Sequence, residues 1–197
     1  MRLCVLMGSP RRNGNTAALM NEFLDQWALL GGESQVIWLY DRQIHACLGC
    51  MACQECMDSL GCVQQDDVAD IFGEMARADG ILLATPIYAW YCTPPMKALV
   101  DRVVYAGNKK YGTQKGPALL EGKCVASLTT CGYPADKGAD LWEEGLKRLC
   151  RHSKMRYLGM FCRRDLGREI PFMNEEAARD ARAFARSLLR MMEVKEP

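Results

Sequence analysis

Short apolar runs alternate with amphipathic stretches along the chain, a pattern typical of alternating strands and helices. Continuous apolar runs predict buried strands over residues 3–7, 36–40, 80–85, 123–130 and 155–162. Apolar residues at helical spacing predict helices over residues 17–30, 66–76, 96–105, 141–150 and 175–192. We therefore expect one α/β domain over residues 1–197, built as a doubly wound sheet of five parallel strands.

The first predicted strand leads directly into a polar turn, GSPRRNGNT, over residues 8–16. Its last residues offer N-cap chemistry for the following helix, whose free amides and positive dipole end make an anion site. Side-chain donors can come from Ser9, Asn15 and Thr16, and positive charge from Arg11 or Arg12. Since the turn lacks the glycine patterns of nucleoside triphosphate and dinucleotide sites, it predicts a bound monophosphate. The alternative is an ordinary capped turn.

The composition narrows the functions that are open to the chain. With 197 residues, 25 Lys and Arg and 24 Asp and Glu, the net charge is +1, and no basic run marks a nucleic-acid surface. No apolar stretch reaches membrane-spanning length, and the N-terminus lacks a signal-peptide pattern. We therefore expect a cytoplasmic protein with no nucleic-acid or membrane partner. Its 11 cysteines, an odd number, are expected to be thiols or metal ligands rather than disulfides.

Five of the cysteines lie in an aperiodic stretch, residues 41–65, which we call the cysteine segment. Their spacing is C-x2-C-x2-C-x2-C-x5-C, and successive C-x2-C steps bring thiolates together as an iron-sulfur cluster requires. Four of the five suffice for a [4Fe-4S] cluster. Cys50, Cys53 and Cys62 belong to both possible sets, and the fourth ligand is either Cys47 or Cys56. Free thiols are an alternative, and zinc is another, although zinc usually takes two separated C-x2-C pairs.

Ligands of doubly wound sheets bind beyond the carboxyl ends of the strands. The loops of residues 85–93 and 129–133 follow the third and fourth predicted strands, so we expect them to meet the turn of residues 8–16 there. The first of these loops is rich in aromatic side chains, which can stack on a planar ligand ring or form a subunit contact. These aromatic residues are Tyr88, Trp90 and Tyr91.

The same segments carry a resemblance to a known family. GSPRRNGNT resembles the phosphate loop of the flavodoxin-like NAD(P)H-dependent FMN reductases, and residues 85–88 resemble their SPxY loop. The K-x-x-x-D-R ending of the family's next helix is matched by Lys97, Asp101 and Arg102. The resemblance implies an FMN cofactor and the flavodoxin-like strand order 2-1-3-4-5. The cofactor-binding residues that it implies are Ser9, Arg11, Asn15, Thr16, Pro86, Ile87, Tyr88, Ala89, Thr130, Cys131 and Gly132.

Cys131 departs from the family pattern, which has glycine at this position. The difference bears on the main chain, because glycine reaches backbone angles that other residues rarely adopt. As a lone cysteine beside a flavin, Cys131 is expected to be inert rather than redox-active.

The cysteine segment is similar to the compact motif of the iron-sulfur flavoproteins, a branch of the same family. In that motif the last cysteine lies a few residues before an Asp-Asp helix start, as Cys62 does before residues 66–67. The CLGC start of the segment also matches the branch. The resemblance thus implies a [4Fe-4S] cluster whose ligands are Cys47, Cys50, Cys53 and Cys62, although many cluster-free members of the family carry a similar cysteine string.

The resemblance further implies an FMN-dependent oxidoreductase that uses NAD(P)H as cosubstrate and a quinone-like or other small acceptor. FMN carries the chemistry, so no side chain is expected to act as a catalytic acid or base. The cluster would relay single electrons to or from a carrier such as ferredoxin, and the protein is expected to form a homodimer or homotetramer. The alternatives are a cluster-free reductase, a non-catalytic carrier like flavodoxin, and a redox sensor with the cysteine segment as thiol switch.

Overall fold

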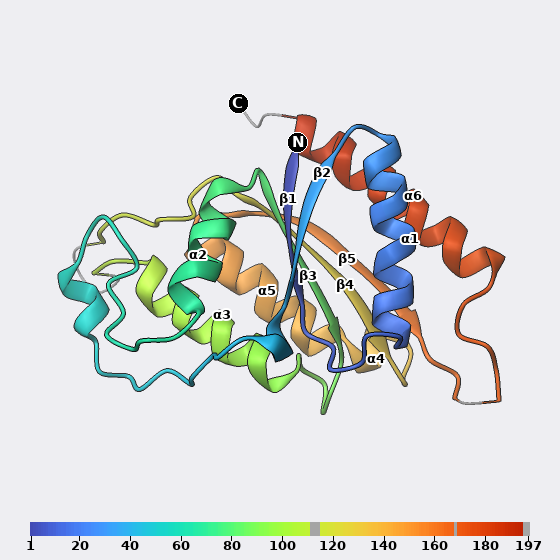
Figure 1. The fold of residues 1–197 in the computed structure, drawn as a ribbon, viewed down its shortest axis with the longest axis horizontal. Coiled ribbons are helices and arrows are strands. Elements are labelled where there is room, and N and C mark those ends of the chain that lie inside the picture. The colour runs from blue at the N-terminus through green and yellow to red at the C-terminus, as the bar shows by residue number, and fades with distance from the viewer. Residues whose placement is uncertain (111–114, 168, 195–197) are drawn as a thin grey trace.

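A computed structural model of the chain describes residues 1–110, 115–167 and 169–194. Its centre is a sheet of five parallel strands in the order β2-β1-β3-β4-β5 (Figure 1). This confirms the predicted fold class and strand order. β1 is an interior strand, since Leu3 pairs with Ser34 of β2 on one side and with Gly80 of β3 on the other.

The predicted elements are present, with shifted boundaries. The strands are β1 (Arg2–Met7), β2 (Glu33–Trp38), β3 (Gly80–Pro86), β4 (Cys124–Cys131) and β5 (Arg156–Arg164). The α-helices are α1 (Asn15–Leu29), α2 (Val68–Arg77), α3 (Pro94–Gly107), α4 (Ala135–Gly138), α5 (Asp140–His152) and α6 (Glu175–Glu193), and two 3₁₀ turns are η1 (Leu39–Asp41) and η2 (Ala52–Glu55). β2 begins at Glu33 rather than at residue 36, because ladder pairing on this edge strand continues through exposed polar residues that carry no apolar signal.

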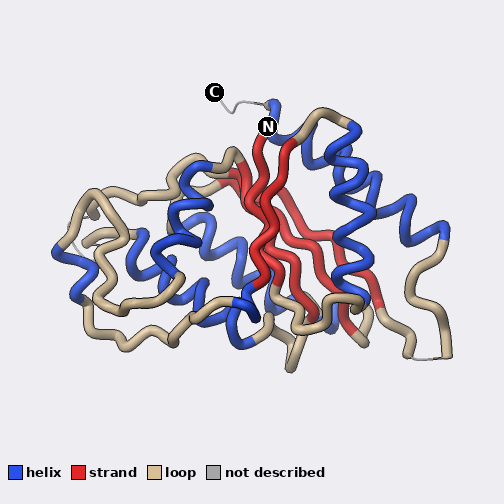
Figure 2. The backbone as a smooth tube through the Cα atoms, viewed as in Figure 1, coloured by secondary structure: helices blue, strands red, loops and turns tan. Residues whose placement is uncertain are grey.

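Helices cover both faces of the sheet (Figures 1 and 2). α1 and α6 pack on one face, and Leu3 and Val5 of β1 join their apolar core. α2, α3 and α5 pack on the other face, which receives Cys4 and Leu6. Successive side chains of a strand point to opposite faces, so the unbroken apolar run of β1 follows from burial on both sides.

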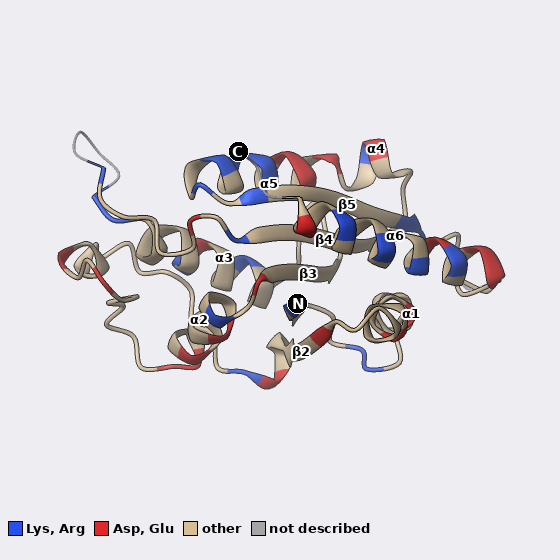
Figure 3. Cartoon of the chain, turned by 90° about the horizontal axis from the view of Figure 1, so that it is seen from above, with Lys and Arg blue, Asp and Glu red and all other residues tan. Residues whose placement is uncertain are grey.

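The outer helices carry charged residues of both signs, as α5 and α6 show (Figure 3). α6 buries Ala181, Ala185 and Leu188 at helical spacing, which explains its strongly amphipathic sequence. Within the described residues, no helix combines the length and the apolar character that a bilayer crossing requires.

The cysteine segment leaves the sheet after η1 and extends past the C-terminal end of α3 before it returns to α2 (Figure 1). It lies beside the connection from α3 to β4, because the Lys110 amide donates to Gln54 Oε1 of η2 at 2.6 Å. That connection contains an isolated bridge between Asn108 and Ala118. The two long connections therefore lie side by side at one end of the molecule.

Candidate functional site

Three loops meet where β1, β3 and β4 end. Thr93, just before α3, donates its hydroxyl to the Gly8 carbonyl at 2.7 Å. The Ile87 amide donates to the Thr130 carbonyl at 2.8 Å, and Thr130 Oγ1 lies 2.8 Å from Thr16 Oγ1. The structure thus brings together the three predicted segments, residues 8–16, 85–93 and 129–133, and we call this region the carboxyl edge.

The first turn of α1 begins at this edge without a side-chain cap. The N-cap residue is Gly14, which lies within the predicted capping stretch and offers no side chain to the first turn. The hydroxyl of Thr16 is instead engaged with Thr130. Among the described residues, the amides of Asn15, Thr16 and Ala17 donate to no other group of the chain. Three N–H groups at the positive end of a helix dipole are therefore open to an anion.

The rest of the turn is tightly built. Ser9 is 2% exposed, and its hydroxyl accepts from the Arg11 amide at 3.2 Å. A Cβ on Gly14 would lie 2.9 Å from Cβ of Arg11, so glycine is required for this close approach. The exposed Arg11 thus stands beside the open end of α1.

Two side chains of the turn, which the sequence offered as possible ligand contacts, are engaged by other groups of the chain. Arg12 is directed away from the turn, since it pairs with Asp41 and its guanidinium lies 4.1 Å from the centre of the Trp38 ring. Asn15 donates its side-chain amide to Asp165 Oδ2 at 2.8 Å. Asp165 follows β5, and no sequence pattern marked it.

The loop after β3 closes in a two-residue hairpin. The amides of Tyr88 and Tyr91 each donate to the carbonyl of the other residue, at 2.8 and 3.0 Å. The central residues Ala89 and Trp90 have φ angles of 47° and 64°, in the left-handed region. Such turns favour Asn and Gly, so an Ala-Trp pair stores backbone strain. This strained hairpin lies three residues after Pro86, which ends β3.

Exposed aromatic rings border the carboxyl edge. Trp90 stacks on Tyr133 with ring centroids 6.2 Å apart and planes 18° apart. Tyr40 also belongs to these exposed aromatic residues, because its hydroxyl is near that of Tyr88. Burial is the first cause that raises the pKa of Tyr40, and the Tyr88 hydroxyl is the second. Tyr91, by contrast, packs edge-on against a buried indole of α5. Sequence reasoning missed Tyr40. It placed Tyr133 in the segment of residues 129–133 but did not single out its ring, because only the loop after β3 had a concentration of aromatic residues.

Cys131 ends β4 in a conformation without positive φ, so cysteine in place of the family's glycine is accommodated there. Its Sγ lies 3.4 Å from Cys162 Sγ on the neighbouring β5. The carbonyl of the next residue, the exposed Gly132, accepts from Arg164 Nε at 3.1 Å. The expectation of a lone cysteine is therefore wrong, because β4 and β5 place two thiols together.

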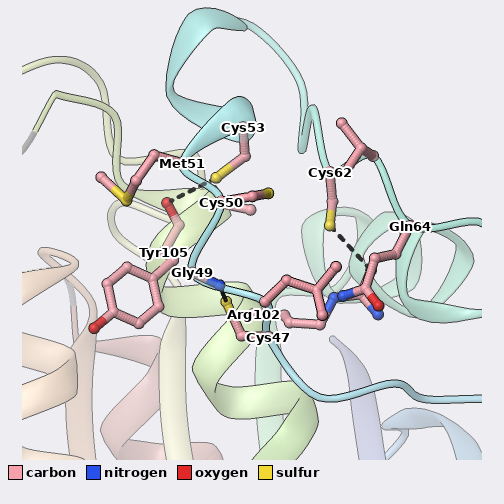
Figure 4. A pocket seen from close by; sticks show the side chains of 12 residues that line it. Cys47, Gly49, Cys50, Met51, Cys53, Cys62, Gln64, Arg102 and Tyr105 are labelled. Atoms are coloured by element: carbon pink, nitrogen blue, oxygen red, sulfur yellow. Dashed lines mark hydrogen bonds between the residues drawn. The ribbon is translucent and has the colours of Figure 1, made fainter.

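The cysteine segment forms a separate pocket against α3 (Figure 4). The side chains of Arg102 and Tyr105 lie on its α3 side. Its lining includes all four cysteines of the first predicted set, which are Cys47, Cys50, Cys53 and Cys62. Cys56 is not part of the lining and lies with its Sγ 2.9 Å from Ser59 Oγ. In the described part of the chain, no three His, Cys, Asp or Glu side chains are placed to hold a metal ion, so the four thiols share a pocket without converging on one point.

A buried arginine holds the segment against α3. Arg102 is 2% exposed, pairs with the buried Asp66 carboxylate and donates Nη2 to Cys62 Sγ at 3.2 Å. Burial raises the pKa of Asp66, but hydrogen bonds from Arg102 and from two backbone amides outweigh it and leave the pKa below its usual value. In the sequence, Arg102 was noted only because it matches the K-x-x-x-D-R helix ending of the family. Nothing in the sequence connected it with a cysteine.

A lysine and a glutamine complete this bracing. Lys109 is 1% exposed and donates Nζ to the carbonyls of Cys53 and Leu60 at 3.0 and 3.1 Å. Burial lowers its pKa. Gln54 donates to the Tyr105 carbonyl at 2.5 Å. These side-chain hydrogen bonds hold the cysteine segment in place, whereas pairing between parallel strands holds the carboxyl edge in place.

Comparison with known proteins connects both regions to one family. Residues 1–160 match the family model of the NADPH-dependent FMN reductases. An iron-sulfur flavoprotein of Methanocaldococcus jannaschii is 38% identical over 102 residues, 52% of this chain and 51% of the relative. An iron-sulfur flavoprotein of Methanosarcina thermophila is 31% identical over 132 residues, 67% of this chain and 64% of the relative. The chain therefore spans between half and two thirds of the length of these curated relatives.

The fold is shared more widely than the sequence. An NAD(P)H:quinone oxidoreductase from Methanothermobacter marburgensis superposes with a TM-score of 0.74 at 17% identity, over 100% of this chain and 98% of that protein. At this identity the likeness concerns the fold. The family assignment rests on the family model, which spans β1 to β4, the carboxyl edge and the cysteine segment, and on the curated relatives. The chain belongs to the family of NADPH-dependent FMN reductases, in the branch of the iron-sulfur flavoproteins.

Proposed function

We propose that this chain is an FMN-dependent oxidoreductase that binds the FMN phosphate at the N-terminus of α1. The observation that carries the proposal is the uncapped first turn of α1, with the open amides of Asn15, Thr16 and Ala17 at the meeting point of three loops. A phosphate would accept from these amides and gain from the helix dipole. Ser9 and Arg11 add a hydroxyl and a positive charge to the same turn.

The flavin ring would be oriented by the loops after β3 and β4. The main chain of residues 86–89 and 130–132 offers amides and carbonyls, and the strained hairpin fixes that main chain before the ligand arrives. The rings of Trp90 and Tyr133 would limit access of water from the exposed side. Bound FMN would supply hydride and electron transfer. The chain's part is to anchor, orient and shield it, which needs no side chain as acid or base.

The electron donor in this proposal is NAD(P)H, and the acceptor is a quinone-like or other small molecule. A relative named FMN-dependent NADH:quinone oxidoreductase 2, from Bacillus cereus, is 32% identical over 103 residues and supports this class of substrate. A ferredoxin-like carrier is the proposed macromolecular partner. A homodimer or homotetramer is the proposed assembly, because the aromatic side chains at the carboxyl edge remain exposed in the single chain.

We also propose that the cysteine segment holds a [4Fe-4S] cluster on Cys47, Cys50, Cys53 and Cys62. These four thiols line one pocket, whereas Cys56 bonds to Ser59 outside it. The donor set fits, since cysteine sulfurs bind iron and Arg102 donates a hydrogen bond to Cys62 Sγ, which helps to orient this sulfur. A bound cluster would supply single-electron transfer to or from the flavin. The second candidate is a cluster-free quinone reductase, which the unconverged sulfurs favour.

The first experiment measures iron, acid-labile sulfide and the visible spectrum of protein purified without oxygen. We expect about four irons and four sulfides per chain and broad absorbance over the flavin bands. Cys62→Ser is expected to lose the iron, and Cys56→Ser is the matched control that keeps it. A flavin spectrum without iron after anaerobic reconstitution would reject the cluster and leave the second candidate.

The second experiment titrates FMN into the apoprotein and then follows NAD(P)H oxidation. Saturable quenching of FMN fluorescence supports the phosphate site, and steady oxidation of NAD(P)H with an added quinone distinguishes an enzyme from an electron carrier. Failure to bind FMN at all would overturn the proposed function.

A further inference from the structure

Two cysteine side chains lie against each other where β4 and β5 end. Cys131 Sγ is 3.4 Å from Cys162 Sγ, and the two strands hold them as diagonal neighbours, since Cys131 pairs with Arg164 and Cys162 with Thr129. Cys131 is 5% exposed and Cys162 is half-buried. The pair is separate from the cysteine segment, which lies at the end of α3, and the proposed function uses main chain at Cys131 but assigns no role to either sulfur atom.

The surroundings make the two thiols unequal. The hydrogen bond with Cys162 is the largest cause that lowers the pKa of Cys131, and the nearby Arg164 guanidinium also favours the thiolate, so the pKa falls to about 7 against the effect of burial. The same hydrogen bond and burial raise the pKa of Cys162. The lowered pKa suits Cys131 to be the attacking thiolate. The raised pKa suits Cys162 to be the resolving thiol, which keeps its proton until the disulfide forms.

The geometry leaves a short path to a bond between the sulfurs. A disulfide needs an S–S distance of about 2.0 Å, so the two sulfurs must close by roughly 1.4 Å. Cys131 is the last residue of β4 and is followed by the exposed Gly132, so the strand end can supply this movement. Two hydrogen bonds keep the end of β4 beside the end of β5 during this movement. The Asp165 amide donates to the Cys131 carbonyl at 2.7 Å, and Arg164 Nε donates to the Gly132 carbonyl.

We propose that Cys131 and Cys162 form a dithiol-disulfide redox site that a small hydroperoxide oxidises. The Cys131 sulfur attacks the hydroperoxide ROOH, the O–O bond breaks, ROH leaves and Cys131 becomes a sulfenic acid. The Cys162 sulfur then attacks the Cys131 sulfur, the S–O bond breaks and water leaves with the Cys162 proton. In sum, two thiols and one ROOH give one disulfide, ROH and water, and two electrons pass from sulfur to oxygen. A small oxidant fits the site, because Cys131 is almost fully covered.

Other cysteines of the chain do not share this arrangement. Burial raises the pKa of Cys92 and of Cys150 to about 12, so both are unreactive thiols near neutral pH. The Cys131–Cys162 bond would also tie the loop after β4, part of the carboxyl edge, to β5. Oxidation of the pair therefore acts on main chain that the proposed function assigns to the flavin.

The test treats the full chain, as purified, with one equivalent of hydrogen peroxide and maps its disulfides after alkylation and trypsin digestion. The expected product joins peptide 124–137 to peptide 157–163 with the loss of two hydrogen atoms. Fragment ions place the bond at Cys131 rather than Cys124. We expect the linked peptide to rise at least about tenfold over untreated protein and to disappear on reduction with dithiothreitol.

The variants Cys131→Ser and Cys162→Ser are expected to give no linked peptide, and Cys150→Ser, a buried cysteine on α5, is the matched control that keeps it. Cys162→Ser should also let Cys131 proceed to sulfinic acid, because no resolving thiol remains. A wild-type chain that gains sulfinic acid at Cys131 without the linked peptide would overturn the proposal. The readout is a covalent bond between two peptides, so it does not depend on FMN binding or on turnover.

Discussion

The carboxyl edge and the cysteine segment are both loop regions, but different forces hold them in place. At the carboxyl edge, short loops leave parallel strands and are joined by hydrogen bonds such as those from Thr93 to Gly8 and from Ile87 to Thr130. The cysteine segment is long and has no strand ladder. Its contacts to α3 and to the connection after α3 come from buried side chains, above all Arg102 and Lys109. The edge is therefore shaped by the fold itself, whereas the segment is shaped by a few charged contacts.

This difference explains why only one region has its polar groups arranged for a ligand. The open amides of α1 point from a rigid helix, so an anion needs no rearrangement of the chain to bind there. The four cysteines of the proposed cluster line one pocket without converging. Metal binding commonly supplies the free energy that gathers such ligands, so we expect the segment to tighten when a cluster binds.

The largest expected effect comes from removing the arginine that braces the segment. Arg102→Ala would leave the Asp66 carboxylate buried without its partner, and breaking a buried pair costs about 3 kcal/mol or more. Urea denaturation should show this loss of stability. Arg148→Ala is the control, since Arg148 pairs with Glu144 on the exposed surface and its loss should change stability far less than the loss of Arg102. Equal losses in the two variants would refute the idea that buried charge holds the segment.

The next effect tests the open end of α1. Asn15→Asp keeps the size of the side chain but places a carboxylate beside Asp165 and the proposed phosphate, so FMN affinity should fall about 30-fold. Fluorescence titration of FMN measures this. Asn174→Asp makes the same change at the N-cap of α6, where Asn174 accepts from the Ala177 amide, and should leave FMN affinity unchanged. If both variants bind FMN like the wild type, the phosphate does not lie at α1.

A smaller effect concerns the pH dependence of the thiol at the carboxyl edge. Thiolate is the reactive form, so the alkylation rate of Cys131 should rise with pH through about 7. Cys162→Ala removes the largest cause of the low pKa, and the midpoint should move up toward the ordinary cysteine value, with about a tenfold slower reaction at pH 7. Cys162→Ser, which can still donate a hydrogen bond, should lie between the two. Rate profiles measured by mass spectrometry that coincide for all three proteins would contradict this prediction.

The smallest effect tests the strain in the hairpin after β3. Ala89 has a φ of 47°, which glycine adopts at lower cost, so Ala89→Gly should stabilise the fold by about 1 kcal/mol. Ala28→Gly in α1 is the mirror control and should destabilise by about 1 kcal/mol, because glycine is unfavourable within a helix. Thermal denaturation compares the two. Loss of stability in Ala89→Gly as well as in Ala28→Gly would show that the hairpin is not strained.

Much of this protein follows from local sequence pattern. Apolar runs located every strand of the sheet, because strands that helices cover on both faces are apolar at successive positions. Apolar residues at helical spacing located the long helices, because each helix buries one side. The resemblance of residues 8–16 and of the cysteine segment to family motifs supplied the strand order and the family, which the sheet topology and the family model confirm.

Only the tertiary structure decided which side chains meet. Asn15 and Asp165 are 150 positions apart, Arg102 and Cys62 are 40 apart, and Cys131 and Cys162 are 31 apart. No period or spacing connects such residues, since each contact depends on how two separate elements pack and on the register between neighbouring strands. Sequence alone therefore determined the elements and their chemistry, whereas the packing of β4 beside β5, and of α3 beneath the cysteine segment, decided which sulfur atoms have a partner.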